Sequence, residues 1–237
     1  MSNRISIIIP VLNEVENIDS LINHLIQSSS SKNIAEIIIV DGGSNDGTIK
    51  KVKTLTTAPN ANIQLLSAPR GRAKQMNLGA KSATGSILYF LHADSIPPLK
   101  FDQLIIKEVE NGNQAGCFRM QFDSKHWWLR LASWLTQFSW RACRGGDQSQ
   151  YISRTLFDDI GGYDERYKIY EDNILINELY ARKKFVVIQK KIKTSTRLYK
   201  KHGIWKLQYH FWSIYVKKWF GASADELYNY YKKHIAL

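Results

Sequence analysis

Residues 35–48 read AEIIIVDGGSNDGT, and this stretch decides the fold. Its apolar run, Ala35–Val40, has the length and composition of a buried strand, and Asp41 follows it directly. The glycine turn Gly42-Gly43 then leads to Thr48, where we expect a helix to begin. A buried strand that passes through a glycine turn into a helix is typical of a βα unit in a parallel sheet.

The same alternation of apolar runs and helical patterns continues on both sides of this stretch and predicts parallel strands joined by helical crossovers. Active sites in such folds gather at the carboxyl ends of the strands. The expected strands are Ile5–Ile9, Ala35–Val40, Ile63–Leu66, Ile87–Leu91, Gly116–Phe122 and Phe185–Ile188. The expected helices are one capped by Asn13 and containing Ile18–Leu25, then Thr48–Leu55, Ala73–Ala83, Leu99–Glu110, His126–Trp140, Glu171–Lys183 and two more between Ile204 and Tyr231. The predicted fold class is α/β, a mostly parallel central sheet with helices on both faces and a C-terminal helical appendage.

The composition supports one folded domain. The chain has 237 residues, and its 44% hydrophobic content excludes a disordered chain. Its two cysteines, Cys117 and Cys143, are too few for a disulfide scaffold or a four-cysteine zinc site. We therefore expect a reduced, cytoplasmic setting, with no secretory or membrane-spanning segment because the longest apolar runs are short.

The net charge of +12 is concentrated in the last quarter of the chain. Residues 1–180 contain 19 basic and 19 acidic residues, whereas residues 181–237 contain 14 basic residues and only Asp225 and Glu226 as acids. Such an asymmetry indicates an anionic partner, either nucleic acid, a lipid surface or a phosphate-bearing substrate. Because residues 1–180 are neutral overall, we expect no nucleic-acid partner.

Acidic residues follow two of the expected strands. Asp41 can accept hydrogen bonds from a nucleoside, and Asp94 in the sequence Leu91–Ser95 can hold a hard divalent cation that bridges a diphosphate. Each also has a simpler explanation, as a residue of a glycine-rich turn or an ordinary loop carboxylate. His92 is more typical of a strand-end histidine that has a satisfied hydrogen bond than of a metal ligand.

Three further segments carry polar groups that suit catalysis or binding. Arg72 near a helix N-terminus suits an anion, and Asp172 at the start of a helix suits a general base. Gly145–Gln148 has the composition of a loop over a ligand. The alternatives are an exposed arginine, acids that stabilise a first helical turn, and a plain connection.

Taken together, these segments resemble a family 2 glycosyltransferase of the GT-A fold, over about residues 4–183. The resemblance rests on five stretches in the same order and at strand ends: Ile8–Glu14, Val40–Thr48, Arg72 with Asn77 and Gly79-Ala80, Leu91–Asp94, and Glu171-Asp172. The spelling His92-Ala93-Asp94 and the loop Gly145–Gln148 are similar to a bacterial branch of transferases associated with radical-SAM and selenoprotein gene clusters.

The resemblance implies a nucleotide-diphosphate sugar donor, a divalent metal ion (Mn²⁺ or Mg²⁺) and inversion at the anomeric carbon. It implies that Asp94 is the metal-binding acid and that Asp172 is the acceptor-activating base, with Glu171 beside it as a second catalytic residue. The implied nucleotide-sugar residues are Pro10, Leu12, Glu14, Asp41, Gly43, Arg72, Asn77 and His92, and the implied acceptor loop contains Gly146, Asp147 and Gln148.

Two departures from the family pattern qualify this expectation. His92 stands where the family has the first acid of its D-x-D motif, which affects donor choice and metal affinity. The tail lacks the Q-x-x-R-W motif of processive synthases, so we expect a single transfer. The expected domain is residues 1–200, with a donor half at 1–123 and an acceptor half at 124–200, followed by a helical extension at 201–237.

Two other functions compete with this interpretation. One is a non-catalytic nucleotide-sugar-binding protein on a degenerate transferase fold, for which His92 is the motivation. The other is a nucleotidyltransferase, but that class needs a glycine- and arginine-rich loop directly after the first strand, where this chain has Pro10–Asn13.

The tail has an aromatic stripe at steps of three and four residues with lysines beside it, which is typical of an interfacial helix. We therefore predict a peripheral protein at the inner face of the cytoplasmic membrane, with a membrane-associated or lipid-linked acceptor. The alternatives are packing of the stripe on the sheet or a homodimer contact. The stripe consists of Trp205, Tyr209, Trp212, Tyr215, Val216 and Trp219.

Overall fold

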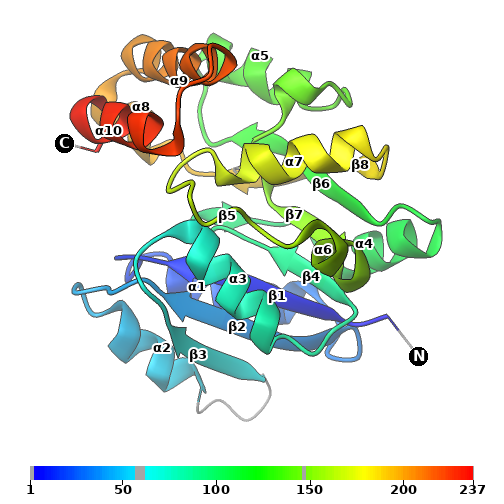
Figure 1. The fold of residues 1–237 in the computed structure, drawn as a ribbon. Helices are drawn as coiled ribbons and strands as arrows, with labels where there is room; N and C mark the ends of the chain where they lie inside the picture. Colours follow the sequence, from blue (N-terminus) through cyan, green and yellow to red (C-terminus); the bar gives the residue numbers. More distant parts are fainter. Residues whose placement is uncertain (1–2, 57–61, 146–147, 237) are drawn as a thin grey trace.

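The computed structural model describes residues 3–56, 62–145 and 148–236. Within these residues eight strands form one sheet in the order β3-β2-β1-β4-β7-β6-β8-β5. Figure 1 shows this sheet between layers of helices. The strands are β1 (Ile5–Val11), β2 (Ile34–Asp41), β3 (Ile63–Ser67), β4 (Ile87–Phe90), β5 (Ser95–Ile96), β6 (Ala115–Phe122), β7 (Gln150–Ser153) and β8 (Phe185–Thr194). The predicted α/β fold with a mostly parallel sheet is confirmed.

Helices cover both faces of this sheet, and three more gather at the C-terminus (Figure 1). They are α1 (Ile18–Ser28), α2 (Thr48–Thr56), α3 (Arg72–Ser82), α4 (Phe101–Glu110), α5 (Trp127–Leu135), the short 3-10 helix η1 (Arg141–Cys143), α6 (Arg154–Ile160), α7 (Glu171–Ala181), α8 (Arg197–His202), α9 (Ile204–Trp219) and α10 (Ala224–His234).

Strand β1 shows why the sheet has two buried faces. Its side chains alternate, so that Ile7 and Ile9 join a core with α1 and α4, whereas Ile8 joins a second core with α3 and α7. All seven residues of the strand are buried. A strand without a polar face fits only between two layers of helices, and this places the functional residues at the strand ends.

The first four strands are parallel, but the second half of the sheet is mixed. Strand β7 lies between β4 and β6 and is antiparallel to both, and β5 pairs antiparallel with β8. Neither β5 nor β7 is predicted from the sequence, because two and four residues are too short for a periodic signal. Helices α6 and α8 are missed for the same reason, and β8 continues beyond the predicted Ile188 across an irregular register with β6.

Two helix boundaries differ from the predictions. The helix expected over residues 126–140 ends at Leu135, after which the Thr136 hydroxyl accepts a hydrogen bond from the backbone N–H of Met120 in β6. Asn13 does not cap α1, which begins at Ile18. The backbone of Asn13 is left-handed (φ 57°), and its side chain is bonded to the neighbouring loop instead.

The C-terminal helices have a small core of their own. Leu207 and Ile214 of α9 pack with Leu227 of α10 and with Ile169, which precedes α7. The aromatic stripe of α9 faces away from this core, since Trp205, Tyr209, Trp212, Tyr215, Val216 and Trp219 are all exposed. Packing of the stripe on the sheet, one alternative from the sequence, is therefore wrong. No helix within the described residues is long and apolar enough to cross a membrane.

Candidate active site

The loops that follow β1 and β2 are bonded to each other at the carboxyl edge of the sheet. Asp41 is buried, and its Oδ2 accepts hydrogen bonds from the backbone N–H groups of Gly43 (2.8 Å) and Ser44 (3.1 Å). Asn13 donates its backbone N–H to the Ser44 hydroxyl and accepts the N–H of Asn45 on its side chain, both at 2.9 Å. These bonds hold the two loops as one preformed wall.

Gln75 of α3 links the two strands that carry these loops, a role that sequence reasoning missed. Its buried Nε2 donates hydrogen bonds to the carbonyl oxygens of Val11 (2.9 Å) and Val40 (2.7 Å), at the carboxyl ends of β1 and β2. A Cβ on Gly42 would lie 3.0 Å from the Gln75 side chain, so only glycine fits there without movement. The sequence signal, a glutamine on the buried face of a predicted helix, was present.

The first turns of α3 and α7 meet at the same edge of the sheet. Arg72 Nε lies 2.7 Å from Glu171 Oε1, and the Glu171 side chain is fully buried. Asp172 is the next residue and is 7% exposed. The contact has the distance of an ion pair without the alignment of a hydrogen bond, because neither oxygen of Glu171 has a hydrogen-bond partner among the described residues.

Burial and a neighbouring acid perturb the Glu171 carboxyl at this junction. Burial raises the pKa of Glu171 above its ordinary value, and the charge of Asp172 raises it further, while Arg72 and His92 oppose the shift. Burial also raises the pKa of Tyr163 well above its usual value, with Asp172 and Glu171 adding to the effect. The ionisable groups of Arg72, Tyr163 and Glu171-Asp172 therefore influence one another, although they come from three separate segments of the chain. Carboxyl groups with perturbed pKa values are concentrated at functional sites.

A second ion pair lies beside the loop that follows β1. Arg197, the first residue of α8, donates to both carboxylate oxygens of Glu14, at 2.8 and 3.3 Å. These hydrogen bonds raise the pKa of Arg197, and the nearby charge of Asp94 also contributes. The pairing of β5 with β8 brings this arginine from the basic tail to the ends of β1 and β4. Sequence reasoning missed it, because Arg197 belongs to no motif.

Some of the predicted nucleotide-sugar residues support the site from within. Asn77 binds the backbone N–H and C=O of Tyr163, both at 2.9 Å, and thereby fixes the loop that precedes α7. Pro10 is buried in β1 beside Val40, whereas Gly43 is exposed with a left-handed backbone. Leu12 is half-buried. Their contacts with a nucleotide stay predictions.

The predicted acceptor loop is held from inside the protein. Gly146 and Asp147 lie outside the described residues. Gln148 is buried, and its Oε1 accepts hydrogen bonds from the Arg144 guanidinium (2.6 Å) and the Cys117 thiol (3.2 Å). Arg144 also donates to two backbone carbonyls after α5, so that this buried cation ties the start of the loop to the chain before it.

The parallel order β3-β2-β1-β4, the antiparallel β7 beside it and the acidic residues after β2 and β4 define a GT-A fold. The chain belongs to glycosyl transferase family 2, whose family model matches residues 6–174. The family and the fold expected from the sequence are therefore confirmed.

Relatives agree with this assignment. The chain is 36% identical to the glycosyltransferase AglE of Haloferax volcanii over 94 residues, which are 39% of this chain and 31% of that protein. It is also similar to TarS 1–349 of S. aureus in complex with UDP (TM-score 0.68, 16% identity, 81% of this chain and 60% of that one). A mannosyltransferase from Pyrobaculum calidifontis in complex with GDP-Man and Mn²⁺ gives a TM-score of 0.68 at 19% identity, covering 90% of this chain and 61% of that one. The chain thus spans about three fifths of the solved relatives.

Proposed function

We propose that the chain transfers a glycosyl group from a nucleotide-diphosphate sugar to an acceptor hydroxyl, in one displacement with inversion at the anomeric carbon. The observation that supports this is the meeting of α3 and α7, where Arg72 lies against Glu171 beside Asp172. An in-line displacement needs an anionic donor and a base for the acceptor side by side. The two first turns supply a cation for the donor and a carboxylate for the acceptor.

Asp172 is the proposed base. It lies in the first turn of α7, where the helix N-terminus stabilises a carboxylate. It takes the proton of the acceptor hydroxyl as the oxygen attacks the anomeric carbon and the bond to the diphosphate oxygen breaks. A base held in this way accelerates a reaction by about 10²–10⁴-fold. Glu171 holds Arg72 by charge and does not itself accept the proton.

The donor site of the proposal is the wall built by the β1 and β2 loops. Asp41 and its exposed neighbour Gly43 face the nucleoside, and the diphosphate lies toward Arg72 and Arg197. Arginine suits phosphate oxygens because its planar guanidinium donates two parallel hydrogen bonds. Glu14 holds Arg197 in place before the donor binds.

A divalent cation could be bound jointly by oxygen ligands of the protein and by phosphate oxygens of the substrate. Within the described residues no three His, Cys, Asp or Glu side chains form a group that could hold a metal ion. Mg²⁺-type ions in nucleotide sites, however, are commonly held by one or two carboxylates together with phosphate oxygens. Asp94, with His92 two residues earlier, would supply the protein's share. The ion, when bound, would stabilise the negative charge that builds on the leaving diphosphate.

The acceptor in this proposal is membrane-associated, and the protein is peripheral at the cytoplasmic membrane surface. The support is the contact between the basic, exposed helix α9 and the segment that contains Asp172, through Tyr215 and Asn173. The proposed relationship to the bacterial branch associated with radical-SAM and selenoprotein clusters rests on the sequence His92-Ala93-Asp94 and on the loop Gly145–Gln148.

The deciding experiment is a thermal-shift screen of UDP, GDP and their sugar conjugates with and without Mn²⁺, followed by turnover assays of the conjugates that bind. Saturating ligand at 100 times its Kd should add about 2.7 kcal/mol of apparent stability. We expect at least one nucleotide to stabilise the protein more strongly with Mn²⁺ and its sugar conjugate to be consumed. Binding without turnover would favour the non-catalytic alternative suggested by His92. The family assignment leaves no support for the nucleotidyltransferase alternative.

A further inference from the structure

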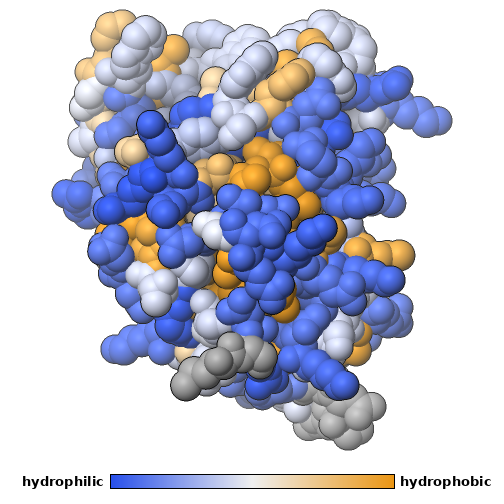
Figure 2. All heavy atoms as spheres, turned by 90° about the vertical axis from the view of Figure 1, so that its right-hand side faces the viewer, coloured by the Kyte–Doolittle hydropathy of each residue, from blue (hydrophilic) through white to orange (hydrophobic). Residues whose placement is uncertain are grey.

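Helices α5 and α9 together present a continuous aromatic surface to solvent. We define it by six exposed residues: Trp127, Trp134, Trp205, Trp212, Trp219 and Phe220. Trp219 and Phe220 are 86% and 84% exposed, although both are large apolar side chains. Figure 2 shows pale and orange residues gathered along the top of the molecule, where α5 and α9 lie, above a side that is mainly blue. A contiguous patch of this kind marks an interaction surface.

The two helices form one surface because they are bonded to each other. The Trp128 indole N–H donates a hydrogen bond to Gln208 of α9 (3.2 Å), and the Trp128 ring lies 5.5 Å from the Trp205 ring and 5.8 Å from the Trp212 ring. On α9 the aromatic residues recur at three- and four-residue steps, and the buried Leu207 lies on the opposite side of the helix. The rings are therefore held outward by a rigid scaffold rather than by a loose tail.

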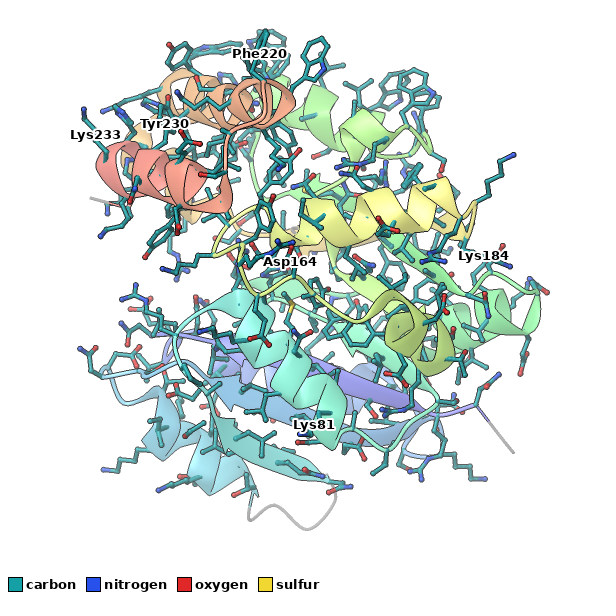
Figure 3. All side chains as sticks on the ribbon, in the orientation of Figure 1. Lys81, Asp164, Lys184, Phe220, Tyr230 and Lys233 are labelled. Atoms are coloured by element: carbon teal, nitrogen blue, oxygen red, sulfur yellow. The ribbon has the colours of Figure 1, made fainter. Side chains whose placement is uncertain are left out.

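Lysines border this surface and select the kind of partner. Helix α9 contains no acidic residue, and Lys206 and Lys217 lie beside its aromatic face. Lys217 and Lys233 also line a cavity of about 410 Å³ between α9 and α10, together with Glu226 and His234. Figure 3 shows Phe220 at the top of the molecule and Lys233 with Tyr230 to one side of it. The chemistry is that of tryptophans at a membrane interface with cations at the level of lipid phosphates.

We propose that the aromatic surface docks on an anionic lipid bilayer and that the acceptor is a lipid-borne molecule; the second part rests on the proposed transferase function. The Trp and Phe rings enter the interfacial region while the lysines contact lipid phosphates. Binding that combines insertion of the rings with electrostatic attraction of the lysines is reversible and weakens as the salt concentration rises.

The orientation that follows brings the lipid surface close to the proposed base. Helix α9 contacts α7 and the segment before it: Lys218 Nζ donates to the Tyr167 hydroxyl (2.6 Å), and Tyr215, at the edge of the aromatic stripe, donates its hydroxyl to Asn173 Oδ1 of α7 (3.4 Å). Asn173 is the neighbour of Asp172. The docked surface and this turn are therefore on opposite sides of a single helix, which is roughly 10–12 Å across with its side chains. A hydroxyl on a lipid headgroup can reach across that distance, which is why a lipid-borne acceptor fits.

The test is co-sedimentation of the full chain with phosphatidylcholine vesicles, with and without phosphatidylglycerol, over a salt series. We expect binding to the anionic vesicles, weakening as salt rises, and a blue shift of tryptophan emission on binding. The double variant Trp219→Ser/Phe220→Ser should bind at least about tenfold more weakly, since it loses the two most exposed rings without touching the core. Lys206→Glu/Lys217→Glu should weaken binding by a similar factor.

Matched controls separate this surface from general effects. Leu99→Ser removes another exposed apolar side chain, and Lys50→Glu/Lys53→Glu makes the same charge change on α2, at the opposite end of the molecule (Figure 1). Both controls should bind vesicles like the parent chain. Vesicle binding is independent of catalysis, so its outcome does not depend on whether a nucleotide sugar is consumed.

Three results would overturn the docking proposal. They are equal binding to neutral and anionic vesicles at every salt concentration, no binding to either, and a dimer in light scattering that the Trp219→Ser/Phe220→Ser variant abolishes. The last would show that a second copy of the chain covers the surface. If docking holds but a nucleotide sugar is transferred to a water-soluble acceptor as fast with vesicles as without, the lipid-borne acceptor is wrong.

Discussion

The guanidinium of Arg72 lies 2.7 Å from the buried carboxylate of Glu171, and this contact joins the proposed donor side of the site to the proposed base side. Arg72 is the first residue of α3 and Glu171 the first residue of α7. A ligand phosphate that attracts Arg72 would therefore act on the turn that contains Asp172.

The Glu171→Gln variant should be more stable than the parent protein at pH 8, because burial raises the pKa of Glu171 more than Arg72 lowers it. A carboxyl whose pKa is raised in the folded state costs stability as the pH rises from its ordinary pKa of about 4.5 through the raised value. The gain in Tm should thus be present at pH 8 and vanish toward pH 4.5. A loss at pH 8 would mean that the ion pair with Arg72 outweighs burial. A gain that is constant with pH would mean that the titration of Glu171 is not its cause.

The Asp172→Asn variant should lose glycosyl transfer by at least about 100-fold while it retains donor binding, since the amide keeps the shape but cannot take a proton. Turnover of the nucleotide sugar and calorimetric binding of the nucleotide measure the two effects separately. Asp158→Asn, an exposed acid on α6, is the matched control. An equal loss of binding and turnover would make Asp172 a binding or structural residue.

The Asp94→Ala variant should stay folded and lose the metal-dependent part of nucleoside-diphosphate binding. The reason is that Asp94 is the proposed protein ligand of a shared cation. Calorimetry with UDP or GDP, with and without Mn²⁺, measures this difference. Asp123→Ala removes an exposed acid just after β6 and should change neither value. Unchanged affinity in Mn²⁺ would refute the assignment of Asp94.

The Arg197→Ala variant should weaken nucleoside-diphosphate binding by about tenfold, because a charge-assisted hydrogen bond to phosphate is lost. Its free energy of unfolding should fall by less than about 1 kcal/mol, since the ion pair with Glu14 is partly exposed. Arg182→Ala, which breaks a comparable exposed pair with Asp159, serves as the control for stability. If both variants bind nucleotide equally well, Arg197 only fastens α8 to the β1 loop.

The Gln75→Met variant should lower the free energy of unfolding by about 1–3 kcal/mol, because the carbonyls of Val11 and Val40 lose a buried donor. Urea unfolding with an unchanged m-value would measure this loss directly. Lys74→Met, the exposed neighbour on α3, should be nearly neutral. A neutral Gln75→Met variant would show that the loop wall does not depend on this bridge.

Much of the fold could be predicted because the signals are local. The apolar runs Ala35–Val40 and Ile87–Leu91 indicate strands by their length. The helices between such runs are indicated by apolar residues at three- and four-residue spacing. The segments that escaped prediction are short: β7 and α6 contain four and seven residues. Strand β7 forms by pairing with β4 and β6, and α6 follows it directly; no local pattern encodes that pairing.

By itself, the sequence determined the βα repeat, the family motifs at the strand ends and the basic, aromatic character of the tail. These properties follow from residue type and spacing along the chain. Only the tertiary structure decided that Arg197 meets Glu14, 183 positions away, that Arg72 lies on Glu171, and that the stripe on α9 faces solvent beside the tryptophans of α5. The physical reason is that such contacts depend on the order of strands in the sheet and on which helix face finds a partner, and both are set by packing across the whole chain.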